Sequence, residues 1–232
     1  SNDFMLTAEE LKILGVSFGV ASRAVVFSLP IAIAFAYWLS RPGFRGKSVL
    51  DALVHLPLVL PPVLIGFILL LLFGRRGPLG AWLYETFDIR LAFTQEGAAL
   101  ATAVMSFPLM VRAIRLAFEA TDARLFEAAA LLRADPLDRF FSIALPLAGP
   151  GVLAGAVTAF AAGLGEFGAV ITFASNVPGE TQTIPLAIYS ALETPGGEAQ
   201  ALRLASLSFA LAITGLAGAE ALNRWSRRRL EE

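Results

Sequence analysis

Residues 127–147, EAAALLRADPLDRFFSIALPL, lie between two long apolar segments but carry too many charges to cross a membrane themselves. Apolar residues recur at spacings of three and four in the first half, which predicts an amphipathic helix. Pro136 ends that helix, because proline lacks a backbone N–H and disfavours helix at the residue before it. A second apolar run follows and closes at Pro146. The sequence therefore predicts a helix–break–helix elbow, residues 124–146, outside the lipid.

The composition of the 232-residue chain identifies an integral membrane protein. Hydrophobic residues make up 56% of the chain and charged residues only 16%, with a mean hydropathy of +0.70, which is far too apolar for a soluble domain of this length. A net charge of −1 argues against a nucleic-acid partner. The chain has no cysteine and one histidine, which excludes disulfides and thiolate ligands, so we expect no metal site.

Five segments are apolar and long enough to cross a bilayer, at about 20 residues per crossing. They cover about residues 13–39, 49–73, 94–118, 147–173 and 199–222. We therefore predict an all-α membrane bundle that forms one domain over residues 1–232. Pro57, Pro61 and Pro62 in the second segment predict a kinked or broken helix. Residues 183–192 predict a short helix that either lies at the membrane interface or dips into it.

Basic residues near the ends of these segments predict the orientation, because short cytoplasmic loops are richer in lysine and arginine. The richer side contains Arg41, Arg45, Lys47, Arg112, Arg115, Arg124, Arg133, Arg139 and the C-terminal arginines. The poorer side contains Lys12, Arg75, Arg76, Arg90 and Arg203. We therefore expect the N-terminus outside the cell, and the elbow and the C-terminus in the cytoplasm.

Two short motifs spell enzyme signatures but lack their structural context. Residues 43–48, GFRGKS, match the end of a phosphate-binding loop, but Arg41 stands where the first glycine belongs and no strand precedes it. Residues 15–19, GVSFG, spell the nucleophile motif of serine hydrolases, which also needs a preceding strand and a nearby histidine. A membrane hydrolase using Ser17 or His55 remains the alternative from another class. We expect no catalytic residue and no enzymatic activity in this chain.

Polar and ionisable residues inside the predicted spans are candidates for a transport path or its gate. These candidates are Arg23, Ser106, Arg112, Thr158, Glu166 and Phe167. Arg23 either extends to the outer interface or faces an aqueous path, and the hydroxyl groups suit a path as well as ordinary helix packing. Glu166 lies about 28 Å along the fourth span at 1.5 Å per residue, near the outer face. Because its carboxylate would repel an anion, we assign Glu166 to the gate.

The elbow resembles the EAA loop of bacterial ABC importer permeases, whose pattern is E-A-A-x(3)-G-x(9)-I-x-L-P. The residues that match at the same spacing are Glu127, Ala128, Ala129, Ile143, Leu145 and Pro146. Arg133 takes the place of the glycine, where a positive φ would cost an arginine more than a glycine. Further stretches are similar to the molybdate branch of these permeases, namely residues 55–62, 74–77, 105–115, 165–168 and 178–185.

The resemblance implies the fold of type I ABC importer permeases, a place in the bacterial inner membrane and an alternating-access mechanism. It implies a homodimer, two cytoplasmic ATPase subunits that hold ATP and Mg²⁺, and a periplasmic molybdate-binding protein, with no cofactor on this chain. Tungstate and sulfate are alternative substrates, because they are similar tetrahedral dianions. The residues that the resemblance assigns to the ATPase contact are Glu127, Ala128, Ala129, Leu132, Arg133, Ala134 and Pro136.

Overall fold

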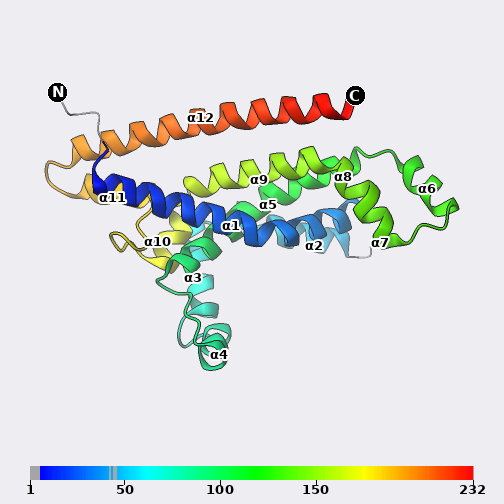
Figure 1. Cartoon of the computed structure of the whole chain (residues 1–232). Coiled ribbons are helices and arrows are strands. Elements are labelled where there is room, and N and C mark those ends of the chain that lie inside the picture. The colour runs from blue at the N-terminus through cyan, green and yellow to red at the C-terminus, as the bar shows by residue number, and fades with distance from the viewer. Residues whose placement is uncertain (1–5, 42, 44–45, 232) are drawn as a thin grey trace.

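The computed structural model describes residues 6–41, 43 and 46–231, with side chains described up to residue 215. Every element in this part of the chain is a helix, which confirms the all-α prediction (Figure 1). The elements are α1 (Ala8–Ser40), α2 (Lys47–Val59), α3 (Pro62–Phe73), α4 (Pro78–Phe87), α5 (Gln95–Glu119), α6 (Ala123–Leu131), α7 (Pro136–Arg139), the π-helical η1 (Phe140–Ala144), α8 (Leu145–Leu147), α9 (Gly149–Leu164), α10 (Gly168–Ala174), α11 (Ile184–Glu193) and α12 (Glu198–Glu231).

The helices α1, α5 and α9 lie side by side and form the centre of the bundle (Figure 1). Small side chains at a helix contact let the two backbones approach closely, and this packing drives helix association in lipid. The buried cluster at this contact includes Ala32, Ala36, Met110, Val111 and Ala159. This three-helix core carries the other elements.

The first and last helices are joined near the N-terminal end of α1. Thr7 and Glu10 form a capping box, in which the Thr7 hydroxyl accepts from the Glu10 N–H and the Glu10 carboxylate accepts from the Thr7 N–H. The buried Glu10 carboxylate also pairs with Arg203 of α12 at 2.8 Å. The helix α11 packs against α12 and α1, and its bounds confirm the short helix predicted over residues 183–192.

The second apolar segment is broken, as its prolines predict. The axes of α2 and α3 differ by 113° across a break at Leu60 and Pro61. Pro61 and Pro62 have no N–H to donate to the preceding turn, so α2 cannot continue through them. The first half of the segment is tied to α5, where Arg115 donates to Asp51 at 2.8 Å. The second half, α3, packs mainly against α10.

The range 147–173, predicted as one span, does not form one helix. The helix α9 ends at Leu164, and α10 begins at Gly168. The Glu166 carboxylate accepts the Ala169 N–H at 2.9 Å, so it caps the start of α10. Glu166 therefore does not lie along a continuous fourth helix. The estimate of about 28 Å assumed such a helix, so it does not apply.

Among the described residues, two single helices, α1 and α5, are each long and apolar enough to cross a membrane. Two bent pairs are candidates for one crossing each, namely α2 with α3 and the segment from α7 to α8 with α9, which is bent by 65°. The fifth predicted span, residues 199–222, falls within the 34-residue helix α12 and extends beyond the described side chains. The five crossings and the sides of the two termini therefore stay predictions.

The elbow is a helix, a turn and a second helix, as predicted. The prediction that Pro136 ends the first helix was wrong, because α6 already ends at Leu131 and Pro136 begins α7. The helix α6 begins after Asp122, whose carboxylate accepts the Arg124 N–H at 2.9 Å, and α7 begins at Pro136. The chain continues through η1 and α8 into α9. Figure 1 shows α6 and α7 at the end of the bundle opposite α11.

Arg133 occupies a left-handed turn that closes α6. Its φ is 60°, which an L-residue adopts only at a cost. The Arg133 N–H bonds to the Ala130 carbonyl and the Ala134 N–H to the Ala129 carbonyl, both at 3.0 Å. These two bonds are the Schellman pattern, whose left-handed position is usually glycine. The turn therefore explains the glycine of the EAA pattern, and arginine adopts the same conformation here.

Gly66→Ala tests the close approach of α3 to α10. A Cβ on Gly66 would lie 2.6 Å from the Ala169 carbonyl oxygen, a backbone atom that cannot rotate aside. We expect the free energy of unfolding to fall by about 1–3 kcal/mol, measured by thermal unfolding of the purified protein. Gly19→Ala in α1 is the control, because nothing lies within 4 Å of its added Cβ. Equal melting temperatures for the two variants would contradict the contact.

Arg133→Gly tests the turn, with Arg133→Ala as the matched control. Both variants lose the arginine side chain, but only glycine is free of the left-handed penalty, which is about 1–2 kcal/mol for other residues. We expect the elbow amides of the glycine variant to exchange with deuterium about fivefold more slowly than those of the alanine variant, because local opening costs more. Identical exchange in the two variants would rule out a left-handed residue at this position.

Candidate functional site

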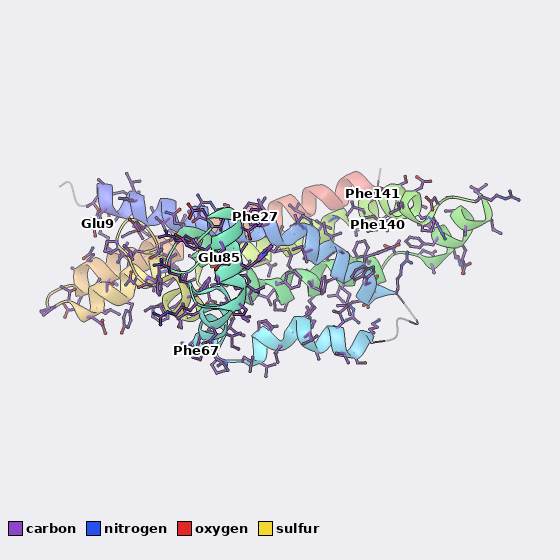
Figure 2. All side chains as sticks on the ribbon, turned by 90° about the horizontal axis from the view of Figure 1, so that it is seen from below. Glu9, Phe27, Phe67, Glu85, Phe140 and Phe141 are labelled. Carbon is purple, nitrogen blue, oxygen red and sulfur yellow. The ribbon has the colours of Figure 1, made fainter. Side chains whose placement is uncertain are left out.

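The elbow exposes large apolar side chains at the end of the bundle. Leu131 and Leu132, where α6 ends, are 86% and 85% exposed, and Leu137 of α7 is 66% exposed. Phe141 is 62% exposed, and Figure 2 shows it beside Phe140. Grouped apolar side chains that no other part of the described chain covers are typical of a surface that binds another protein. We call these four residues, Leu131, Leu132, Leu137 and Phe141, the elbow surface.

The residues that the EAA resemblance assigns to the ATPase contact divide between two faces of the elbow. The exposed ones are Glu127, Ala128, Leu132, Arg133 and Pro136, and Ala134 is half-buried. Ala129 is only 9% exposed and accepts the Schellman bond from Ala134. Ala129 therefore belongs to the inner face of α6, where it supports the turn. Their contact with an ATPase stays a prediction.

An aromatic cluster attaches the elbow to the three-helix core. The ring of Phe140 lies 4.7 Å from Tyr37 of α1 and 6.4 Å from Phe118 of α5, between ring centroids. Tyr37 and Phe118 also contact each other at 5.4 Å. Phe140, the first residue of η1 directly after α7, therefore packs against the ends of α1 and α5. The sequence analysis missed this cluster, because its members are far apart in the chain. The available signal was an aromatic residue near the end of each of two predicted spans and another in the elbow.

The candidate path residues in the centre of the bundle have ordinary partners. Arg23 donates to Gln95 at the start of α5 at 2.8 Å, which joins two helices. The hydroxyls of Ser106 and Thr158 each donate to a carbonyl four residues back in their own helix, both at 2.8 Å. Arg112 is exposed on α5. The hydroxyl groups therefore serve their own helices in this conformation.

The candidate gate residues lie at the break before α10. Glu166 caps α10, and the ring of Phe167 contacts Tyr189 of α11 at 5.3 Å. Gly168 packs so closely on Pro62 of α3 that an added Cβ would lie 2.7 Å from the proline side chain. In the described part of the chain, no hydrogen bond, ion pair or ring contact joins Arg23, Ser106, Arg112 or Thr158 to one another or to Glu166 and Phe167 at the break. The structure therefore does not gather them into one site.

A cavity of about 950 Å³ lies between α9, α11 and α12, and sequence patterns did not predict it. Its lining is mostly apolar, with Phe18, Phe160, Ile188 and Leu211 among the larger side chains. Thr158 is the one predicted path residue in the lining, and its hydroxyl is already bonded to Ala154. No arginine, lysine or histidine is among the described residues that line the cavity, so these residues offer nothing to balance the charge of an anion.

The hydrolase alternative finds no support in the geometry. Ser17 is 2% exposed, its hydroxyl donates to the Ile13 carbonyl at 3.0 Å, and it accepts the Ile184 N–H at 2.8 Å. His55 bonds to the Asp51 carbonyl of its own helix at 2.8 Å. The Ser17 hydroxyl therefore joins α1 to α11, and no histidine activates it. Residues 44 and 45 of the loop-like motif at 43–48 lie outside the described residues, and Lys47 and Ser48 begin the helix α2 with no strand before them in the described part of the chain.

Comparison with known proteins identifies the family. The family described as "Binding-protein-dependent transport system inner membrane component" matches residues 28–230. The "Molybdenum transport system permease protein ModB" of Escherichia coli K12 is 55% identical, over 97% of this chain and 98% of that protein. The protein of the same name from Haemophilus influenzae is 48% identical, over 96% of each chain.

Solved structures share the fold at low sequence identity. A bacterial alginate ABC transporter in complex with an alginate-bound periplasmic protein superposes with a TM-score of 0.74 at 14% identity, covering 94% of this chain and 79% of that one. An amino acid ABC transporter superposes with a TM-score of 0.61 at 15% identity, covering 92% of each. The chain has the type I ABC importer permease fold, and it belongs to the family of binding-protein-dependent transport system inner membrane components.

Proposed function

We propose that this chain is the permease subunit of an ABC importer that carries molybdate across the inner membrane. The observation that carries this proposal is 55% identity, over 97% of the chain, to a permease named for molybdenum transport. The apolar elbow surface also supports the proposal, because a permease that is driven by a separate ATPase needs a surface that this ATPase can bind and move. ATP and Mg²⁺ are held by that partner.

The elbow surface is the part that contacts the ATPase in this proposal. Leu131 and Leu132 are exposed at the end of α6, and burying them in a groove of the partner is favourable by about 1.5–3 kcal/mol for each side chain. Glu127 and Pro136 are exposed beside them and set the polar edge of the contact. Movement of the ATPase then passes through Phe140 to Tyr37 and Phe118, and so to the core helices.

Two copies of the chain form the path, with one elbow for each of two ATPase subunits. The described lining of the apolar cavity beside α9 has no basic side chain, so we do not assign the dianion to it. If the path lies between two permease copies, exposed faces of both copies line that path. Alternating access then follows if ATP binding brings the two elbows together and the copies rock between outward-open and inward-open arrangements.

The substrate is molybdate delivered by a periplasmic binding protein. Tungstate and sulfate remain the alternatives, since each is a tetrahedral dianion of similar size. We assign the choice among the three anions to the binding protein, because the described lining of the cavity beside α9 carries no basic side chain.

Glu127→Arg tests the coupling. Glu127 is exposed on α6, so reversal of its charge should leave the fold intact and place a like or unpaired charge in the contact. We expect molybdate uptake per permease to fall about tenfold, with weaker co-purification of the ATPase. Glu180→Arg makes the same charge change in the exposed loop before α11, at the other end of the bundle, and should keep the ATPase bound. Unchanged uptake and ATPase retention in Glu127→Arg would remove the elbow from the contact.

Transport by the reconstituted complex tests the substrate. Proteoliposomes that hold the permease, its ATPase and its binding protein should take up labelled molybdate only when ATP is present on the side of the ATPase. Unlabelled tungstate and sulfate added in equal excess then rank the three anions by competition. ATP-driven uptake of sulfate with none of molybdate would refute the assignment of substrate but keep that of an importer.

A further inference from the structure

Contacts between α1, α5 and α4 indicate that the short helix α4 lies near the outer boundary of the membrane. Arg23 is about 26 Å from Ser40, the end of α1, at 1.5 Å per residue, and a hydrocarbon layer is about 30 Å thick. Arg23 donates to Gln95, so the start of α5 lies at the same level. Residues 88–94 connect α4 directly to that start. Figure 1 shows α4 beside the bundle, at the far end of α3, and not at either end of the long helices.

The surroundings of α4 are apolar on one side and aromatic on the other. The preceding helix α3 exposes an apolar face opposite its contact with α10, including Val63 at 53%, Phe67 at 48% and Leu71 at 56%. On α4 itself, Trp82 and Phe87 are 55% and 57% exposed, and their rings contact each other edge-on at 5.6 Å. Exposed tryptophan beside a wholly apolar helix is the composition found where a membrane surface meets water.

Two arginines from opposite ends of α4 converge on one tyrosine. The guanidinium of Arg75 lies 5.6 Å from the ring of Tyr84, and that of Arg90 lies 4.7 Å from it. Arg90 also donates to the Tyr84 hydroxyl at 3.0 Å. Within the described residues no carboxylate lies within 4 Å of either guanidinium, although Glu85 and Asp88 are exposed on the same short segment.

The two guanidiniums beside the Tyr84 ring favour the binding of an anion. Two positive charges held against the same ring repel each other, and the attraction of each for the ring is only about 0.5–1 kcal/mol at an exposed site. A phosphate that accepts hydrogen bonds from both guanidiniums removes the repulsion, and guanidinium is well shaped for such bidentate contacts. Adjacent exposed rings of Trp82 and Phe87 indicate that the phosphate belongs to a molecule with apolar chains.

We propose that α4 is an interfacial helix that binds the phosphate of an anionic phospholipid in the outer leaflet through Arg75 and Arg90, with Tyr84 aligning the two guanidiniums. Trp82 and Phe87 enter the region between headgroups and acyl chains. The bound lipid would also fix α3, whose Gly66 packs against α10 next to the candidate gate. The proposal rests on the membrane location and on an outer position for α4, and it is independent of the anion that is transported.

Fluorescence of a single tryptophan tests the position of α4. Trp38→Phe and Trp225→Phe leave Trp82 as the only tryptophan of the full-length chain, in nanodiscs that contain brominated lipids. We expect Trp82 to be quenched more strongly by bromines near the headgroups than by bromines at the chain ends. Absence of quenching by both lipids, or loss of quenching when the periplasmic binding protein is added, would overturn the proposal in favour of a protein contact.

Lipid retention tests the arginines. Purified permease in mixed phosphatidylglycerol and phosphatidylcholine should retain phosphatidylglycerol preferentially, and Arg75→Gln with Arg90→Gln should reduce that preference at least about fivefold. Arg112→Gln with Arg124→Gln is the control, since it removes two exposed charges at other places and should leave the preference unchanged.

Displacement of the lipid by excess inorganic phosphate or molybdate would show a site for free oxyanions instead. An unchanged preference in the Arg75 and Arg90 variant would overturn the proposal outright. Neither readout depends on uptake, so failure here leaves the transport proposal untouched.

Discussion

Close contact between α1, α5 and α9 is the constraint on which the other features depend. A Cβ on Gly163 of α9 would lie 2.7 Å from the Thr102 side chain, and one on Gly155 would lie 3.0 Å from the Met110 carbonyl oxygen. Lipid tails are as apolar as the side chains, so burial alone does not bring helices together in a membrane, and packing at such contacts must. The elbow, the bent α2–α3 pair and the gate region are all attached to this core.

The elbow combines a defined shape with an exposed apolar surface. Its shape comes from local chemistry, with Asp122 at the start of α6, the left-handed Arg133 at its end and Pro136 at the start of α7. Its attachment comes from the cluster of Tyr37, Phe118 and Phe140. A surface shaped this way and anchored to two core helices can transmit a movement of the ATPase to those helices, which is its role in the proposed function.

The periodicity and charge of the sequence were enough to predict the helical class, the elbow and the break at Pro61. These features depend on neighbouring residues, because proline and helix caps act within a few positions. The split between α9 and α10 was not predicted. The close approaches of Gly66 to Ala169 and of Gly168 to Pro62 beside that split join segments far apart in the chain, and only the folded chain shows them. The path residues were the weakest part of the prediction, because hydroxyl groups that look available in a sequence bond to their own helix carbonyls in the structure.

The central claim is that the elbow faces the cytoplasm and is covered by the ATPase, and cysteine labelling tests it most directly. The chain has no cysteine, so Leu131→Cys provides a unique label site, and Leu192→Cys, at a 62% exposed position of α11, provides its counterpart. A membrane-impermeant maleimide should label Leu131→Cys only in inverted vesicles stripped of ATPase, with protection when ATPase is added back, and should label Leu192→Cys only from outside. Labelling of Leu131→Cys from outside, or equal labelling with and without the ATPase, would contradict the account.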